Sequence, residues 1–494
     1  MDLGNFDSLG YILPELILVG TIITVLLADL FVDDKDRLGE IALAGTALAL
    51  FGLAMVNGNQ PGWLFSRMIV HDPFAVFFKM VFGLSALAAI WMSLGSVEVR
   101  GMNRGEYYGL LLSSVLGTFF MASAANLLMA YLSLEFVSIT SYVLTGYLRH
   151  NRRSGEAALK YLIYGGVASG AMIYGMSWIF GLAGTMDFAG INEALRQGEP
   201  NKLALLIGIV LTLAGLGYKI AAVPFHMWAP DVYQGAPLPI TAFLSVGSKA
   251  GGFALWIRIF YPALSQPAGG GNWEFIAGVD WPQVVLVLSM VTMTLGNFTA
   301  LSQRNLKRLL AYSSIAHAGY MLMAFVVLNN EGLVAMMFYI VAYYLMNIGA
   351  FLAVMIVANQ TGSEDIDTFR GLAWRGGVAP AVAMTVFLVS LIGLPPMVGF
   401  IGKLYLFAAV VKQQFYFLAT VGVLNSLVSA FYYFRIIRTM FLDQPQGNEA
   451  PLSVSWHNGA LLYGLSVATI VFGIYWEPVI GLAARSLRFF VGPV

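Results

Sequence analysis

Long apolar stretches recur along almost the whole chain, and they constrain its fold more than any other feature. A stretch of about 20 residues with few charges is long enough to cross a lipid bilayer as a helix. Only 11% of the 494 residues are charged, whereas a soluble domain carries about 25%. A transmembrane barrel would show alternating segments of about 10 residues, which this sequence lacks. The sequence therefore predicts an all-α polytopic membrane protein.

These stretches predict fourteen membrane spans. The spans are expected near residues 10–31, 38–57, 72–97, 106–124, 126–148, 156–182, 203–223, 237–262, 281–302, 308–328, 333–358, 378–411, 414–440 and 456–480. Proline interrupts helical hydrogen bonding, so we predict two broken helices. The seventh span should continue past Pro224 as a half-helix, and the twelfth should break at Pro395–Pro396. The first basic residue is Lys35, so the first stretch is expected to stay in the membrane rather than act as a signal peptide.

Basic residues are distributed unevenly between the two sets of predicted loops. The loops after odd-numbered spans contain fourteen: Lys35, Arg37, Arg100, Arg104, Arg149, Arg152, Arg153, Arg304, Lys307, Arg308, Arg370, Arg375, Arg435 and Arg438. The loops after even-numbered spans contain five: Arg67, Arg196, Lys202, Arg258 and Lys412. Because cytoplasmic loops are enriched in lysine and arginine, both termini are predicted to be periplasmic.

A weak internal repeat relates the two halves of the chain. The segment SVGSKAGGFALWIRIF from Ser245 matches SLVSAFYYFRIIRTMF from Ser426 at four of sixteen positions, and Lys249 falls opposite Ala430. The two predicted breaks are also five spans apart, so the second copy would be inverted in the membrane. We predict an N-terminal three-helix segment (1–105), a first repeat (106–262), a second, inverted repeat (281–440) and a C-terminal span and tail (441–494).

The sequence contains no cysteine, which excludes thiolate-bound iron–sulfur clusters and Cys-containing zinc sites in this chain. Its histidines are far apart and lack metal- or haem-like spacing: His71, His150, His226, His317 and His457. It has no P-loop, dinucleotide fingerprint or H-E-x-x-H motif. We therefore expect no cofactor and no metal in this chain, and we expect any coupled redox chemistry in partner proteins.

An acidic residue and two lysines lie deep within predicted spans. Glu135 is near the middle of the fifth span, while Lys219 and Lys249 lie in the seventh and eighth. Burial alone favours a neutral lysine, and a nearby carboxylate favours a charged one. A Glu–Lys pair whose separation changes can therefore bind and release a proton. The alternatives are a neutral, hydrogen-bonded glutamate and lysines that extend to the membrane surface.

Three further residues extend this set. His226 follows the first break, His317 is central in the tenth span, and Lys403 follows the second break. Histidine titrates near neutral pH, which suits a proton relay, although either histidine can instead be structural. The place of Lys403 in the second repeat favours proton exchange with one side of the membrane, with extension to the surface as the alternative.

Other charged residues are predicted to be structural. Glu15, Asp29 and Lys79 lie near the ends of predicted spans. Glu156 and Lys160 are four residues apart and are expected to form a pair on a helix surface.

Several motifs together resemble a known family. The run YKIAAVPFHMWAPDVYQGAPLPITAFLSVGSKAGGFAL resembles the signature of the proton-translocating antiporter-like family. This family includes membrane subunits of respiratory complex I and of Mrp-type cation/proton antiporters. The runs LSLEFVSITSYVLTGY, RRSGEAALKYLIYGG and GLPPMVGFIGKLYLF extend the resemblance over nearly the whole chain. Within the family, the chain is most similar to N-type subunits of bacterial NADH:quinone oxidoreductase (complex I). Three features favour this type: the run VPFHMWAPDVYQGAP, Lys403 at a position where M-type subunits have glutamate, and the lack of the long lateral helix of L-type subunits.

The resemblance implies two inverted five-helix repeats and a proton-translocating polar axis. This axis would contain Glu135, Lys219, Lys249, His226, His317 and Lys403. Flavin, iron–sulfur clusters and quinone would belong to partner subunits. The implied partners in the membrane arm are an M-type antiporter-like subunit, small core subunits and the lateral helix of an L-type subunit. The implied location is the inner (cytoplasmic) membrane of a bacterium.

Three alternatives remain open from the sequence. The chain can be a subunit of an Mrp-type Na⁺/H⁺ antiporter, or the equivalent subunit of a ferredoxin- or F420H2-dependent complex. It can also be a structural scaffold, although buried charges argue against a scaffold because each is costly in a membrane.

Overall fold

Twelve helices are long and apolar enough to cross a membrane among residues 4–100, 102–445 and 451–487, which the computed structural model describes. Two further predicted spans correspond to α6 (Arg104–Ser123) and to the divided helix α17–α18 (Val378–Ile392 and Val398–Lys412). The predicted polytopic all-α fold is therefore confirmed. Within the predicted C-terminal segment, residues 446–450 and 488–494 lie outside the described residues.

The other elements follow in chain order. The helices are α1 (Asn5–Ser8), α2 (Leu13–Asp29), α3 (Asp36–Val56), α4 (Pro73–Leu94), α5 (Val97–Arg100), α7 (Leu127–Thr145), α8 (Arg152–Ala183), α9 (Phe188–Gln197), α10 (Lys202–Ile220), α11 (Trp228–Gly235), α12 (Leu238–Phe243), α13 (Lys249–Leu264), α14 (Trp281–Ala300), α15 (Leu306–Val326), α16 (Asn330–Thr361), α19 (Tyr416–Phe441), α20 (Trp456–Ile474) and α21 (Glu477–Leu487). The strands are β1 (Gly62–Leu64), β2 (Ile69–His71), β3 (Ser265–Gly269) and β4 (Asn272–Phe275).

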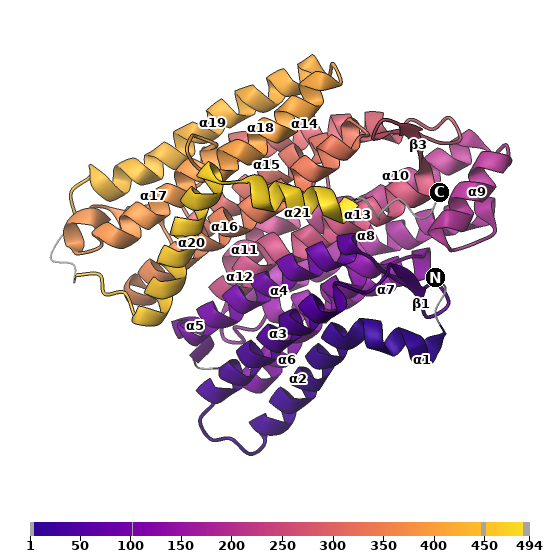
Figure 1. The fold of residues 1–494 in the computed structure, drawn as a ribbon. Helices are drawn as coiled ribbons and strands as arrows, with labels where there is room; N and C mark the ends of the chain where they lie inside the picture. Colours follow the sequence, from indigo (N-terminus) through magenta and orange to yellow (C-terminus); the bar gives the residue numbers. More distant parts are fainter. Residues whose placement is uncertain (1–3, 101, 446–450, 488–494) are drawn as a thin grey trace.

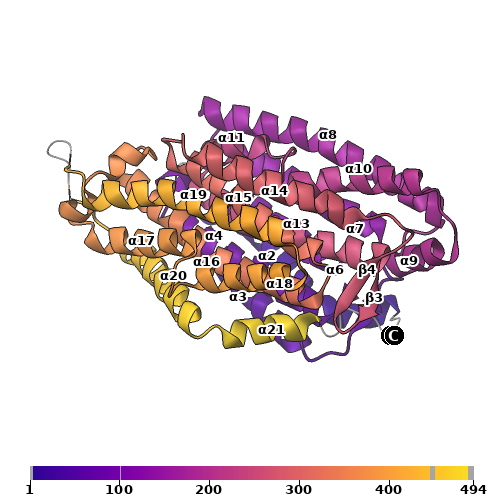
Figure 2. The ribbon, with the colours of Figure 1, turned by 90° about the horizontal axis from the view of Figure 1, so that it is seen from above.

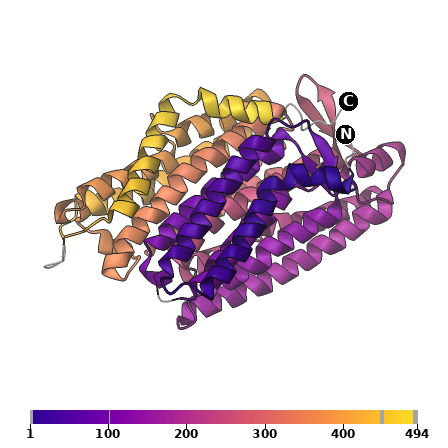
Figure 3. The ribbon, with the colours of Figure 1, turned by 60° about the horizontal axis from the view of Figure 1, so that its bottom comes forward.

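The helices form one bundle with two distinguishable ends. The antiparallel hairpins β1–β2 and β3–β4 lie at the same end of the bundle (Figure 1). We call this end the hairpin face and the opposite end the loop face. The N-terminal helices α2, α3, α4 and α6 pack together along one side (Figure 3). Seen from above, α8 and α21 lie along opposite edges (Figure 2).

Burial differs sharply between the central and outer helices. In the most apolar 18-residue stretch of each helix, the share of buried residues is 100% for Leu238–Leu264 and 94% for α15. For the segment that contains α2 it is only 28%. Outer helices such as α2 and α19 present large apolar side chains on one face, as expected for contact with lipid or other membrane proteins. The polar groups of α13 and α15 are consequently enclosed by protein.

Both predicted helix breaks are present. Helix α10 ends before Ala221, which has a left-handed φ of 60°, and the chain resumes as α11. Helix α17 ends before Gly393, with a φ of 89°, and the chain resumes as α18. Each break contains a cis proline bond, Val223–Pro224 or Pro395–Pro396. The breaks leave backbone carbonyls without helical partners inside the bundle.

The eighth span contains an irregularity that the sequence did not predict. Residues Leu244–Ser248 form a π-helical turn between α12 and α13. Such turns are uncommon and often occur at functional sites. Here the turn directly precedes Lys249, the first residue of α13.

Some basic residues that were counted with the loops lie inside helices instead. Arg258 is buried in α13, and Lys307 is buried in the first turn of α15. Their side chains satisfy internal acceptors rather than face the solvent, so they carry less information about orientation than truly exposed loop residues.

Arg258 forms a buried double ion pair that fastens α13 to the start of α4. Its Nη1 and Nη2 atoms lie 2.7 and 2.6 Å from the carboxylate of Asp72, and its Nε donates to the carbonyl of Ala122 at 2.7 Å. Asp72 also accepts a hydrogen bond from the amide of Ala75, as an N-cap.

The Asp72→Ala variant should be strongly destabilised, because it leaves a buried guanidinium without its counter-ion. Removing one partner of such a pair typically costs about 3–5 kcal/mol. The matched control is Asp34→Ala, which breaks an exposed pair with Arg37 and should cost less than about 1 kcal/mol. The apparent Tm of the purified protein in detergent measures both effects. Equal Tm values for the two variants would contradict the role of this pair.

Candidate functional site

Lys219 and Glu135 lie near one another but do not form a direct ion pair. Lys219, in the last turn of α10, is 2% exposed, and its Nζ donates to the hydroxyl of Ser138 at 3.2 Å. Ser138 lies one turn after Glu135 on α7. Oε1 of Glu135 is buried and has no hydrogen-bond partner among the described residues. The predicted pair is thus open in this structure, with a hydroxyl beside the ammonium.

Lys249 contacts the second half of the chain. It is 2% exposed, and its Nζ donates to the carbonyl of Ser314 at 2.7 Å and to its hydroxyl at 2.5 Å. Ser314 belongs to α15, which also carries His317 one turn later. The π-helical turn before Lys249 therefore ends where the two halves of the molecule meet.

His317 is surrounded by tyrosines. Its Nδ1 lies 2.7 Å from the hydroxyl of Tyr339 on α16, and its Nε2 lies 3.4 Å from the hydroxyl of Tyr433 on α19. The Tyr433 hydroxyl is also hydrogen-bonded to Ser313 on α15. Both ring nitrogens thus face hydroxyls, which can donate or accept a proton.

Lys403 occupies the second helix break. Its Nζ donates to the carbonyls of Leu391 and Ile392, at 3.2 and 2.7 Å. These are the last two carbonyls of α17, and a cation at a helix C-terminus is favoured by their partial charge. Nζ also donates to Ser426 at 2.9 Å and lies 4.7 Å from the ring centroid of Tyr320.

A chain of aromatic and polar contacts connects the surroundings of His317 with those of Lys403. The ring centroids of Tyr433 and Tyr432 are 4.3 Å apart, and the Tyr432 hydroxyl donates to Asn297 at 3.0 Å. The amide of Asn297 lies 3.3 Å from the hydroxyl of Tyr320, whose ring lies under Lys403. Helices α14, α15, α18 and α19 therefore place His317 and Lys403 in one buried region, and Lys249 on α13 joins it through Ser314 of α15.

His226 is not connected to this region by any hydrogen bond among the described residues. It is buried in the segment between α10 and α11, and its Nδ1 has no hydrogen-bond partner in the part of the chain that the structure describes. Lys219 approaches α13 through its stem: a Cβ added to Gly252 would lie 3.2 Å from Cγ of Lys219. Gly252 lies one turn after Lys249 on α13. Lys219 therefore packs one turn away from Lys249, without a direct polar contact between the two lysines.

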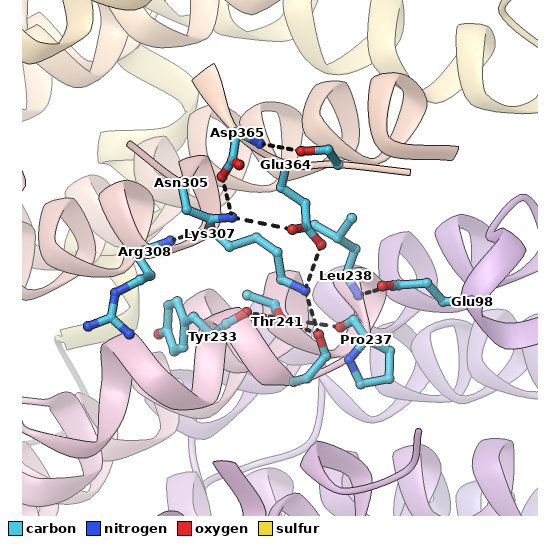
Figure 4. Close-up of polar contacts among 12 residues, drawn as sticks. Glu98, Tyr233, Pro237, Leu238, Thr241, Asn305, Lys307, Arg308, Glu364 and Asp365 are labelled. Carbon is cyan, nitrogen blue, oxygen red and sulfur yellow. Dashed lines mark hydrogen bonds and ion pairs between the residues drawn. The ribbon is translucent and has the colours of Figure 1, made fainter. Parts of the chain in front are cut away.

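A second polar cluster surrounds the start of α12 (Figure 4). Glu98 accepts a hydrogen bond from the amide of Leu238 at 2.8 Å. Lys307 reaches from α15 to the carbonyl of Ala236 at 2.8 Å and lies 3.6 Å from Glu364 (Figure 4). These groups satisfy the backbone at the end of α11 and the beginning of α12. Glu98 and Lys307 lie at span ends, so the sequence alone does not distinguish them from ordinary loop residues.

The surface pair Glu156–Lys160 is present as predicted, at 2.6 Å. Lys160 Nζ also lies 2.7 Å from Asp231 on α11, and Asp231 pairs with Arg308 on α15. The half-helix after the first break is thus fastened to helices from both halves of the chain.

Gly393 brings the second break close to Lys403. A Cβ at this position would lie 2.8 Å from Cδ of Lys403, and the backbone has a left-handed φ of 89°. We expect Gly393→Ala to displace the lysine and to destabilise the chain by about 1–3 kcal/mol through backbone strain.

The matched control for this prediction is Gly184→Ala, with a φ of 70° but no atom within 4 Å of the added Cβ. Both variants should lower the apparent Tm, but only Gly393→Ala should also lower the proton translocation that the family resemblance implies. Equal pumping by the two variants would show that the Gly393–Lys403 contact is unimportant.

This arrangement suits the movement of protons inside a low-dielectric bundle. Three buried lysines each lie beside a hydroxyl, and tyrosines, serines and a histidine lie between two of them. Buried polar atoms without partners, such as Glu135 Oε1, are normally satisfied by ordered water. Within the described ranges, no group of three or more His, Cys, Asp or Glu residues is placed to hold a metal ion.

Comparison with known proteins agrees with this architecture. Residues 124–429, more than half of the chain, match the family described as NADH:quinone oxidoreductase/Mrp antiporter, TM. A protein of Chloroherpeton thalassium named NADH-quinone oxidoreductase subunit N 2 is 46% identical over 96% of this chain and 94% of its own length. NADH-quinone oxidoreductase subunit N of Anaeromyxobacter sp. is 45% identical over 99% of this chain and 98% of its own length.

Solved structures show the same fold. A chain of respiratory complex I from Thermus thermophilus is 29% identical, with a TM-score of 0.79 over 96% of this chain and 100% of its own. A chain of the Mrp complex from Dietzia sp. superimposes with a TM-score of 0.84 over 99% of this chain and 98% of its own, at 20% identity, and shows the fold alone.

The broken helices and buried lysines define an antiporter-like membrane subunit, and the chain belongs to the NADH:quinone oxidoreductase/Mrp antiporter family of membrane proteins. The relatives that match nearly its whole length are named subunit N. The family resemblance predicted from the sequence is therefore confirmed, and so is its N-type character.

Proposed function

We propose that this chain is the proton-translocating N-type subunit in the membrane arm of a bacterial NADH:quinone oxidoreductase. The observation that carries the proposal is the buried polar region that runs from Lys249 through His317 to Lys403. Intramembrane ionisable groups are costly and are functional by default. The full-length relatives named subunit N support the complex to which we assign the chain.

Each residue of the axis has a proposed role. Lys219, with Glu135 and Ser138 beside it, stores a proton, and a change in the Glu135–Lys219 separation alters how firmly it is held. Lys249 and His317 pass the proton between the two halves. Lys403 exchanges it with one side of the membrane. His226 is a further relay group, and it reaches Lys219 through water.

The proposal also includes the wider organisation of the chain. The loop face is cytoplasmic, so both termini are periplasmic, in the inner membrane of a bacterium. Residues 106–262 and 281–440 are the two inverted repeats, between the N-terminal segment 1–105 and the C-terminal segment 441–494. As part of this translocase, the chain holds no redox centre; flavin, iron–sulfur clusters and quinone belong to partner subunits. Its neighbours are an M-type subunit, the small core subunits and the lateral helix of an L-type subunit.

Affinity purification of the tagged full-length chain from native membranes tests this assignment. We expect flavin and iron–sulfur proteins to copurify, together with NADH:quinone reductase activity. Purification without redox subunits, combined with Na⁺-dependent proton exchange by the isolated material in vesicles, would instead support an Mrp-type antiporter. Reductase activity that requires reduced ferredoxin or F420H2 in place of NADH would assign a related complex.

A further inference from the structure

The N-terminal helices contain a buried ion pair that lies outside the proposed axis. Nζ of Lys79 on α4 lies 2.6 Å from Oε1 of Glu15 on α2, and the two side chains are only 4% and 2% exposed. Oε2 of Glu15 has no hydrogen-bond partner among the described residues. The sequence predicted both residues to be structural, near the membrane surface, but the structure encloses them. Well-packed apolar residues would join these helices at least as firmly, so fastening alone does not explain the pair.

Other titratable groups lie around this pair at the hairpin face. His71, at the end of β2, has its Nε2 3.1 Å from the carbonyl of Val56 and its ring centroid 5.2 Å from that of Tyr11. Burial and, secondarily, the ammonium of Lys79 lower the pKa of His71, so its ring is neutral at pH 7 and can accept a proton. The next residue is Asp72, which is paired with Arg258.

Polar groups also connect this region with the level of Lys249. Arg258 lies nine residues after Lys249 on α13, or about 14 Å along the helix. Arg258 donates to the carbonyl of Ala122 on the neighbouring helix α6. On that helix the hydroxyls of Ser114 and Ser123 are buried without a hydrogen-bond partner among the described residues. Buried hydroxyls of this kind are normally satisfied by water, so α6 offers buried sites where water can bind.

We propose that Glu15 and Lys79 form a second proton-binding pair, which receives protons from the first half of the axis and releases them at the hairpin face. This inference rests on the proposed function, because it requires protons to move along the axis. In this structure Nζ of Lys79 lies directly against the carboxylate of Glu15. A proton delivered to Glu15 leaves the ammonium of Lys79 without a counter-ion, which favours loss of the lysine proton towards His71 and solvent. Transfer of the Glu15 proton to Nζ then restores the pair.

The test uses the assembled complex in inverted membrane vesicles and measures protons pumped per NADH oxidised. Glu15→Gln and the double variant Glu15→Leu/Lys79→Leu should both lower this ratio at least about twofold, since each removes a positioned proton-transfer group. The control Asp29→Asn breaks the Lys35–Asp29 pair at the other end of α2, which is partly exposed, and should leave the ratio unchanged. A wild-type ratio in the assembled Leu/Leu variant overturns the proposal.

Infrared difference spectra of the complex, with and without NADH, provide a readout that does not depend on the Leu/Leu variant assembling. A protonated-carboxyl band that appears in the wild-type protein and is lost in the isosteric Glu15→Gln variant supports the pair. Identical spectra overturn it. Lys249→Met, measured in parallel, separates the two proposals. Normal pumping in the Glu15 variants, with reduced pumping in Lys249→Met, rejects only the second pair. Normal pumping in both sets of variants also rejects the axis.

Discussion

Replacing Lys249 with methionine is expected to abolish proton translocation through this chain without unfolding it. Methionine has a similar length and is apolar, so it fills the fully protein-enclosed space around α13. It cannot hold a proton or donate to the carbonyl and hydroxyl of Ser314, which are the contacts that join the two halves. A positioned proton-transfer group typically contributes a factor of about 10²–10⁴. We therefore expect the pumping rate to fall by at least about 10²-fold.

The matched control for Lys249 is Lys202→Met, which removes an exposed lysine at the start of α10. Inverted vesicles with a pH-sensitive dye measure pumping, and NADH oxidation with an artificial electron acceptor checks that the redox subunits remain assembled. Equal pumping by the two variants would place the proton route elsewhere.

The Lys219→Met and Glu135→Gln variants should produce the next largest effect. Lys219 loses Ser138, its one hydrogen-bond partner among the described residues, when the ammonium is removed. Glu135→Gln removes the negative charge that stabilises the protonated lysine. We expect Lys219→Met to reduce pumping by at least about 10-fold and Glu135→Gln by a smaller factor, because glutamine cannot ionise but keeps the shape.

Glu156→Gln is a suitable control for Glu135, because Glu156 is exposed and pairs with Lys160 at the surface of α8. It should leave pumping within the range of the wild-type protein. If Lys219→Met pumps as well as this control, then the proposed storage site is wrong.

The breaks and the buried lysines could be predicted because each has a local signal in the sequence. A proline in an apolar run interrupts a helix wherever the rest of the chain lies, and a lysine in the same run is costly in lipid. For this reason Lys219, Lys249 and Lys403 were selected without tertiary information, and the structure buries all three.

The polar groups between the lysines could not be identified in the same way. The chain has 23 tyrosines, and nothing local distinguishes Tyr433 or Tyr320 from those that face lipid or solvent. These two residues reach the axis because α15 and α19 pack around His317 and Lys403. Ser138 was missed for a similar reason: its distance from Lys219 depends on how α7 and α10 approach each other.

Position along a span also proved a weak guide. Glu15 and Lys79 were assigned a structural role because they lie near span ends, but their neighbours exclude solvent from both. Lys307 was counted with the loops, but α15 begins one residue earlier and buries it. The burial of a residue at a helix end depends on which other elements pack over that end. The sequence of one span does not show which elements these are.

The central claim is that protons pass along one axis through both halves of the chain and reach Lys403. The most direct test is the number of protons pumped per NADH oxidised by inverted vesicles that contain Lys403→Met. The control is Lys412→Met, which removes an exposed lysine on the same helix as Lys403, where it pairs with Glu331 of α16. The account predicts that Lys403→Met lowers the ratio and that Lys412→Met does not. A wild-type ratio in an assembled Lys403→Met complex would contradict it.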